Sequence, residues 1–144
     1  MPYLLDTNHC IYLINGLEKT TELRSKKEVN VIKTIRELDD YESLYISEVT
    51  IGELYYGAFC SIKREQNLEK IQRLKLIVTP ININEKTWEI FGETKSHLRQ
   101  SGKLITDFDI LIACTASQYD LVLVTNDKDF EALQNYIKMT DWTV

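Results

Sequence analysis

The sequence predicts an α/β protein, a three-layer α/β/α sandwich with a mainly parallel central sheet. Two observations favour this class. Short apolar runs alternate along the chain with segments whose apolar residues recur at helical spacing. Only 5 Gly and 2 Pro occur in 144 residues, a composition that favours long regular elements. The chain length predicts a single domain over residues 1–144.

The first half of the chain is expected to contain two strands and four helices. Residues 3–5 are an apolar run typical of a buried strand, and the helix predicted over 8–15 ends at Gly16. Helical spacing of apolar residues predicts a helix over 26–39, and a second strand follows over 44–46. Ser47 is a suitable N-cap for a helix over 48–60. A further amphipathic helix contains Leu68, Ile71 and Leu74.

The second half continues the alternation. Residues 77–83 are predicted to form a strand interrupted by Pro80. Asn84 can cap a helix that ends at Gly102, with its core side chains expected to be Trp88, Phe91 and Leu98. A helix over 107–119 precedes the most strongly apolar strand, 121–125. A short helix near 129–135 and an extended segment over 139–144 complete the chain.

The lack of targeting segments and the spacing of the cysteines argue against several classes of protein. The N-terminus lacks the basic and apolar regions of a secretory signal, and no stretch approaches the roughly 18 apolar residues of a membrane span. Cys10, Cys60 and Cys114 are widely spaced without a CxxC motif, which predicts reduced thiols rather than a zinc site. We therefore expect a cytoplasmic protein without a membrane partner.

The negative charge is concentrated near the C-terminus. The formal net charge is -5, and residues 105–144 contain two basic and seven acidic side chains, which account for the whole imbalance. Aspartates are favoured at helix N-termini, and Asp129, Glu131, Asp141 and Asp107 fit that simple interpretation. The remaining acids need a different explanation.

Four carboxylates from distant segments are predicted to meet at one edge of the sheet. Asp6 directly follows the first strand, and Glu53 lies in the second turn of the helix that follows the second strand. Asp109 lies in the first turn of the helix that precedes strand 121–125, and Asp127 comes just after that strand. The carboxyl edge of an open α/β sheet is where such folds bind ligands.

This grouping of acids indicates a metal site. Unpaired carboxylates in one pocket repel one another, and divalent cations relieve the repulsion. A site made only of carboxylate oxygens favours Mg²⁺ or Mn²⁺, as one or two ions. Two such ions can activate water and stabilise the leaving oxygen in phosphodiester hydrolysis. The residues themselves therefore indicate metal-dependent phosphoryl chemistry.

Four segments resemble, in order, the motifs of PIN-domain nucleases, and most closely those of the VapC ribonuclease toxins of bacterial toxin–antitoxin pairs. They are Leu4-Leu5-Asp6-Thr7-Asn8, residues 47–54, residues 107–113 and residues 123–130. The resemblance places Asp6, Glu53, Asp109 and Asp127 at the family's acidic catalytic and metal-binding positions. Small polar residues that support the site would be Asn8 and Thr125, with Asp107 as an additional acid found in some members.

The resemblance implies an Mg²⁺- or Mn²⁺-dependent endoribonuclease that leaves a 5′-phosphate and a 3′-hydroxyl. It also implies a homodimer and a cognate antitoxin protein that blocks the site. The alternatives are a PIN-domain nuclease of RNA processing outside a toxin–antitoxin system and a non-catalytic PIN scaffold. Segments 16–42 and 60–104 carry no motif, and their basic residues are better explained by solvated helix faces than by RNA contacts, although phosphate contacts must come from some part of the chain.

Two other classes of small Mg²⁺-binding α/β protein fit poorly. A response-regulator receiver needs an acidic pair after the first strand, whereas Asp6 stands alone. A haloacid dehalogenase-type phosphatase needs Asp-x-Asp there, and this chain has Asn8 at the second position.

Overall fold

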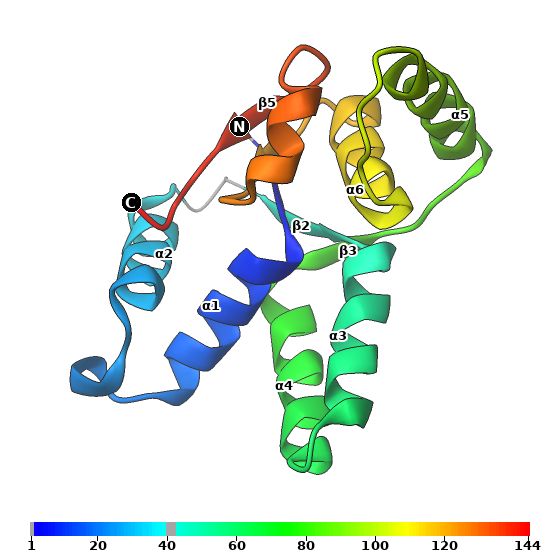
Figure 1. The fold of residues 1–144 in the computed structure, drawn as a ribbon. Helices are drawn as coiled ribbons and strands as arrows, with labels where there is room; N and C mark the ends of the chain where they lie inside the picture. Colours follow the sequence, from blue (N-terminus) through cyan, green and yellow to red (C-terminus); the bar gives the residue numbers. More distant parts are fainter. Residues whose placement is uncertain (1, 40–42) are drawn as a thin grey trace.

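The computed structural model describes residues 2–39 and 43–144, and its centre is a five-stranded sheet in which every paired strand is parallel (Figure 1). The strand order is β3-β2-β1-β4-β5. The strands are β1 (Tyr3–Leu5), β2 (Leu44–Ser47), β3 (Thr79–Ile81), β4 (Val122–Val124) and β5 (Lys138–Thr140). The predicted α/β class and parallel sheet are confirmed.

Helices connect the strands. The α-helices are α1 (Thr7–Glu18), α2 (Lys26–Glu37), α3 (Glu48–Cys60), α4 (Arg64–Ile77), α5 (Glu85–Gln100) and α6 (Asp107–Gln118). Two 3₁₀-helices, η1 (Thr21–Leu23) and η2 (Lys128–Leu133), are shorter. Within the described ranges, no helix combines the length and apolar character that crossing a membrane requires.

Alternation along the strands produces two hydrophobic cores, one on each face of the sheet. Leu4 packs with α5, α6 and η2, whereas its neighbour Leu5 packs with α1, α2 and α4. Leu123 and Val124 divide in the same way, because successive strand residues point to opposite faces. Figure 1 shows α5 and α6 as a pair away from α1 and α4. The arrangement is therefore helices, sheet, helices.

Side-chain caps explain where the helices of the future site begin. Asp6 caps α1, Ser47 caps α3 and Thr106 caps α6, each by accepting a backbone N–H of the first turn. Asp6 directly follows β1, and Ser47 is the last residue of β2. Each of these strands therefore ends where a helix begins. The chain thus turns sharply at the carboxyl edge and holds first-turn side chains against it.

Three local predictions were wrong. Gly16 does not end the first helix, which continues to Glu18; the absence of a side chain at Gly16 instead makes room for Ile32 and Glu28 of α2. The strand predicted from Ile77 is shorter, since α4 extends to Ile77 and only Thr79–Ile81 pair. Pro80 is tolerated there because β3 lies at the edge of the sheet. Trp88 is not a core residue, since it is 51% exposed.

Candidate active site

Three aspartates meet beyond the carboxyl end of β4. Asp109, Asp127 and Asp129 each present a carboxylate oxygen, and these oxygens lie within 4.8 Å of one another. Asp109 comes from the first turn of α6, and Asp127 caps η2 directly after the sheet. The predicted meeting of Asp109 with Asp127 is therefore present in the structure.

Asp129 belongs to this cluster, although the sequence suggested only a helix-end role for it. The backbone N–H of Asp129 donates to Oδ1 of Asp127 at 2.9 Å, a turn that brings the second carboxylate back beside the first. Two acids separated by one residue immediately after a buried strand are the signal that could have revealed it. The side chain remains exposed, so solvent reaches the cluster.

The electrostatics of Asp109 reflect its crowded surroundings. Partial burial raises the pKa of Asp109, and a hydrogen bond with Thr106 opposes that increase. The negative charges of Asp127, Glu53 and Asp129 raise the pKa of Asp109 further. Glu53, which lies on α3, is therefore close enough to act on the cluster electrostatically. A divalent cation fits this donor set, because hard anionic oxygens converge from three residues and their repulsion is uncompensated.

Thr7 holds the carboxylate of Glu53. The hydroxyl of Thr7 donates to Oε1 of Glu53 at 2.8 Å, and the hydroxyls of Thr7 and Thr50 lie 3.3 Å apart. These contacts tie the first turn of α1 to α3 across the carboxyl edge. Sequence reasoning missed Thr7 because Asn8 beside it looked like the supporting polar residue. The structure places Asn8 on the exposed side of α1.

Asp6 is buried directly after β1, with 3% of its surface exposed. Its backbone N–H donates to the carbonyl of Val124 at 3.0 Å, which ties it to the neighbouring strand β4. Its Oδ1 accepts the backbone N–H of His9 at 2.8 Å and lies 2.9 Å from the ring Nδ1 of His9. Its oxygens do not join the 4.8 Å group of the three aspartates. His9 therefore holds Asp6, a contact that no motif in the sequence predicts.

The remaining predicted residues occupy different positions. Thr125 is buried, and its hydroxyl accepts the backbone N–H of Asp127 at 3.1 Å, so it shapes the turn that carries that acid. Asp107 does not cap α6, because Thr106 does so. Instead the carboxylate of Asp107 pairs with Nζ of Lys95 on α5 at 2.7 Å, with both side chains about half exposed.

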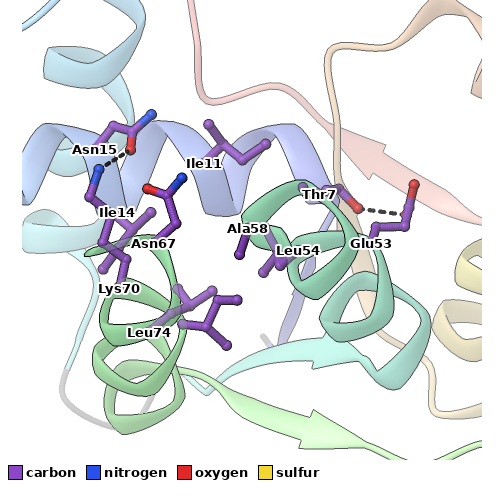
Figure 2. A pocket seen from close by; sticks show the side chains of 12 residues that line it. Thr7, Ile11, Ile14, Asn15, Glu53, Leu54, Ala58, Asn67, Lys70 and Leu74 are labelled. Carbon is purple, nitrogen blue, oxygen red and sulfur yellow. Dashed lines mark hydrogen bonds between the residues drawn. The ribbon is translucent and has the colours of Figure 1, made fainter. Parts of the chain in front are cut away.

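A pocket opens beside Glu53, between α1, α3 and α4 (Figure 2). Its volume is about 220 Å³, and its floor is mainly aliphatic, with Ile14, Leu54 and Leu74 among the lining residues. Lys70 lies at its rim, where its Nζ donates to Oδ1 of Asn15 at 3.2 Å. Figure 2 shows the hydrogen bond between Thr7 and Glu53 at the opposite end of the pocket from Lys70 and Asn15.

This fold, with acids gathered at the carboxyl edge of a parallel sheet, defines a class of protein. The chain matches the PIN domain family over residues 3–135, and it belongs to that family. It is 32% identical over 143 residues to ribonuclease VapC2 of Rickettsia felis, covering 99% of this chain and 98% of the relative.

Solved structures agree with the sequence relatives. The structure of VapBC-1 from nontypeable Haemophilus influenzae aligns over 100% of both chains, with a TM-score of 0.83 and 31% identity. That of VapBC2 from Rickettsia felis, bound to a DNA fragment from its promoter, aligns over 99% of both chains, with a TM-score of 0.80 and 30% identity. Within the PIN family, the chain is thus similar to VapC ribonucleases.

Proposed function

We propose that this chain is a ribonuclease toxin of a toxin–antitoxin pair and that it cleaves RNA internally with the help of Mg²⁺ or Mn²⁺. The observation that carries this proposal is the meeting of Asp109, Asp127 and Asp129 at the carboxyl edge, within electrostatic reach of Glu53. A non-catalytic PIN scaffold would have no need to retain this repulsive arrangement. The relatives named as ribonucleases support the same reading.

The acids divide the work. Asp109 and Asp127 would hold the cation. Asp129 and Oδ2 of Asp6, the oxygen that does not bind His9, would be its further ligands. A bound cation would neutralise the phosphodiester and activate a water molecule for attack at phosphorus. We assign acceptance of the water's proton to Glu53, because it lies outside the converging three and only one of its oxygens is held, by Thr7.

The test uses purified protein and a labelled RNA. We expect cleavage with Mn²⁺, loss of cleavage with EDTA, and products that carry a 5′-phosphate. An Asp6→Asn variant should remain folded and lose at least about 10²-fold in rate, since it removes one carboxylate charge from the site. Asp120→Asn is the matched control, because Asp120 is exposed at the opposite end of α6. Undiminished cleavage by folded Asp6→Asn would contradict the proposal.

A cognate antitoxin is the expected protein partner. The solved structures that this chain resembles are those of VapBC assemblies, which supports a protein partner for this chain. The aliphatic pocket supports the same proposal, because an apolar side chain seated there would lie next to Glu53 (Figure 2). Co-expression with the adjacent reading frame, followed by tagged purification, tests this partner. A chain recovered alone would argue against it.

We also propose that the protein forms a homodimer and that it acts in the cytoplasm. Tyr56, Phe59 and Ile62, at the end of α3 and the turn after it, are 74%, 54% and 100% exposed. Such apolar exposure supports a face for a second copy of the chain. Light scattering of the purified protein measures the mass in solution. An RNA substrate is consistent with a cytoplasmic location.

A further inference from the structure

His9 is fully buried, and each of its two ring nitrogens lies within hydrogen-bonding distance of a polar group of another residue. Nδ1 lies 2.9 Å from Oδ1 of Asp6, and the backbone N–H of Trp142 donates to Nε2 at 3.3 Å. Oδ1 of Asp141 lies 3.7 Å from Nε2, beyond hydrogen-bonding distance. The imidazole therefore bridges the first strand and the end of the chain.

The backbone donor determines which nitrogen carries the proton. Because Trp142 N–H occupies the lone pair of Nε2, the ring proton resides on Nδ1 and is donated to Asp6. Oδ1 of Asp6 then accepts two hydrogen bonds from His9, one from the backbone and one from the ring. Among the described residues, no hydrogen bond engages its other oxygen, Oδ2. An imidazole that orients a carboxylate in this way affects the affinity for a metal ion without contacting the ion.

The segment that supplies the backbone donor is itself held in place. The ring of Trp142 packs edge-on against Tyr3 with a centroid separation of 5.0 Å, and Nδ2 of Asn30 donates to the carbonyl of Thr143 at 2.7 Å. Residues 141–143 lie beyond the span 3–135 that matches the PIN domain family. The C-terminal segment is thus clamped to β1 and α2.

We propose that His9 is a positioning residue for Asp6, and that the C-terminal segment 141–143 fixes its tautomer and orientation. The proposal rests on the proposed function, in which Asp6 contributes to cation binding. It assigns to His9 no contact with RNA or with the cation. His9 sets the direction of the Asp6 carboxylate and so sets the affinity of the site for a divalent ion.

Two substitutions separate this role from simple packing. Asn places its amide nitrogen near the position of Nδ1 and keeps the donor to Asp6, whereas Gln places its amide near Nε2 and loses that donor. We expect His9→Asn to keep Mn²⁺ affinity within about 3-fold of wild type and His9→Gln to lose roughly 10-fold or more. Free Mn²⁺ is measured by electron paramagnetic resonance, with kcat and KM followed in parallel.

A purely structural role would lower the Tm of both variants and leave their Mn²⁺ affinities alike, which would overturn the proposal. Failure of wild type to bind Mn²⁺ would instead overturn the proposed function. Wild-type protein provides a check that does not depend on folding of the variants. Nitrogen-15 spectra should show His9 protonated at Nδ1 and shifted by Mg²⁺, with His97 as the internal control. A proton on Nε2 would contradict the inference.

Discussion

Asp109 is held where its charged form is unfavourable. It is partly buried, and three other carboxylates act on it, so its pKa is raised. An acid whose pKa is higher in the folded state than in the unfolded state takes up protons on folding. The resulting penalty on stability is present at neutral pH and disappears as the pH falls below the carboxylate range. The role proposed for Asp109 and the stability of the protein are therefore opposed at this residue.

An Asp109→Asn variant should therefore be more stable than wild type when no metal is present. We expect its Tm at pH 7 to rise by roughly 1–3 °C, because the amide keeps the shape and removes the charge. The gain should shrink as the pH is lowered and Asp109 of the wild type becomes protonated. Thermal unfolding in EDTA from pH 4 to pH 8 measures this. A gain that is equal at all pH values would show that charge is not its cause.

For individual residues, the sequence predicted where the acids lie but not which residues bind to them. Asp109 and Asp127 could be placed together because strand and helix lengths bring them to the same edge. The contribution of Asp129 depends on a tight turn, and that of His9 depends on Trp142, which is far away along the chain. For Asp129 the only sequence signal is its spacing from Asp127 after the strand, and for His9 there is none, because a contact with a distant backbone N–H leaves no pattern.

Among the elements, the contact between α1 and α2 depends on a glycine. A Cβ at position 16 would lie 2.7 Å from Cδ1 of Ile32 and 3.2 Å from Cβ of Glu28. Glu28 cannot move freely, since it closes a capping box with Ser25 and pairs with Nζ of Lys19 at 2.9 Å. The close packing of α1 against α2 therefore requires a glycine at position 16.

Gly16→Ala and Gly92→Ala should change stability in opposite directions. Alanine gains about 1 kcal/mol of helix propensity at either position, but overpacking at position 16 costs roughly 1–3 kcal/mol. No atom lies within 4 Å of the added Cβ at Gly92 in α5. Urea unfolding should show net destabilisation by about 1 kcal/mol for the first variant and stabilisation for the second. A stabilised Gly16→Ala protein would mean that α2 can move aside.

Sequence patterns predicted the order of these elements well and their boundaries less well. Capping residues such as Ser47 and Asn84 act locally, so the helices they begin were found. The end of α1 and the start of β3 depend on neighbouring elements instead. Trp88 was misplaced because helical spacing alone does not identify which flank of α5 faces α6; its ring packs edge-on against Phe91 at 5.5 Å between centroids and remains half exposed.

For the whole molecule, the concentration of acids predicts that binding of the proposed cation would increase stability. A ligand that binds only the folded state stabilises it by about 2.7 kcal/mol at a concentration of 100 times its Kd. We expect Mn²⁺ at that level to raise the Tm by roughly 5–10 °C. Asp109→Asn should abolish most of this rise, and Asp120→Asn should not. An equal rise in both variants would place the ion elsewhere on the chain.

The sheet order also determines when during synthesis the protein can become complete. β1 is made first, yet it lies between β2 and β4, and Leu5 pairs with Val124 near the other end of the chain. Closing so long a loop is slow, and it cannot begin before β4 has been translated. Asp6 and Asp127 are therefore kept apart throughout most of translation. A nascent chain has no assembled site with which to attack the RNA around it.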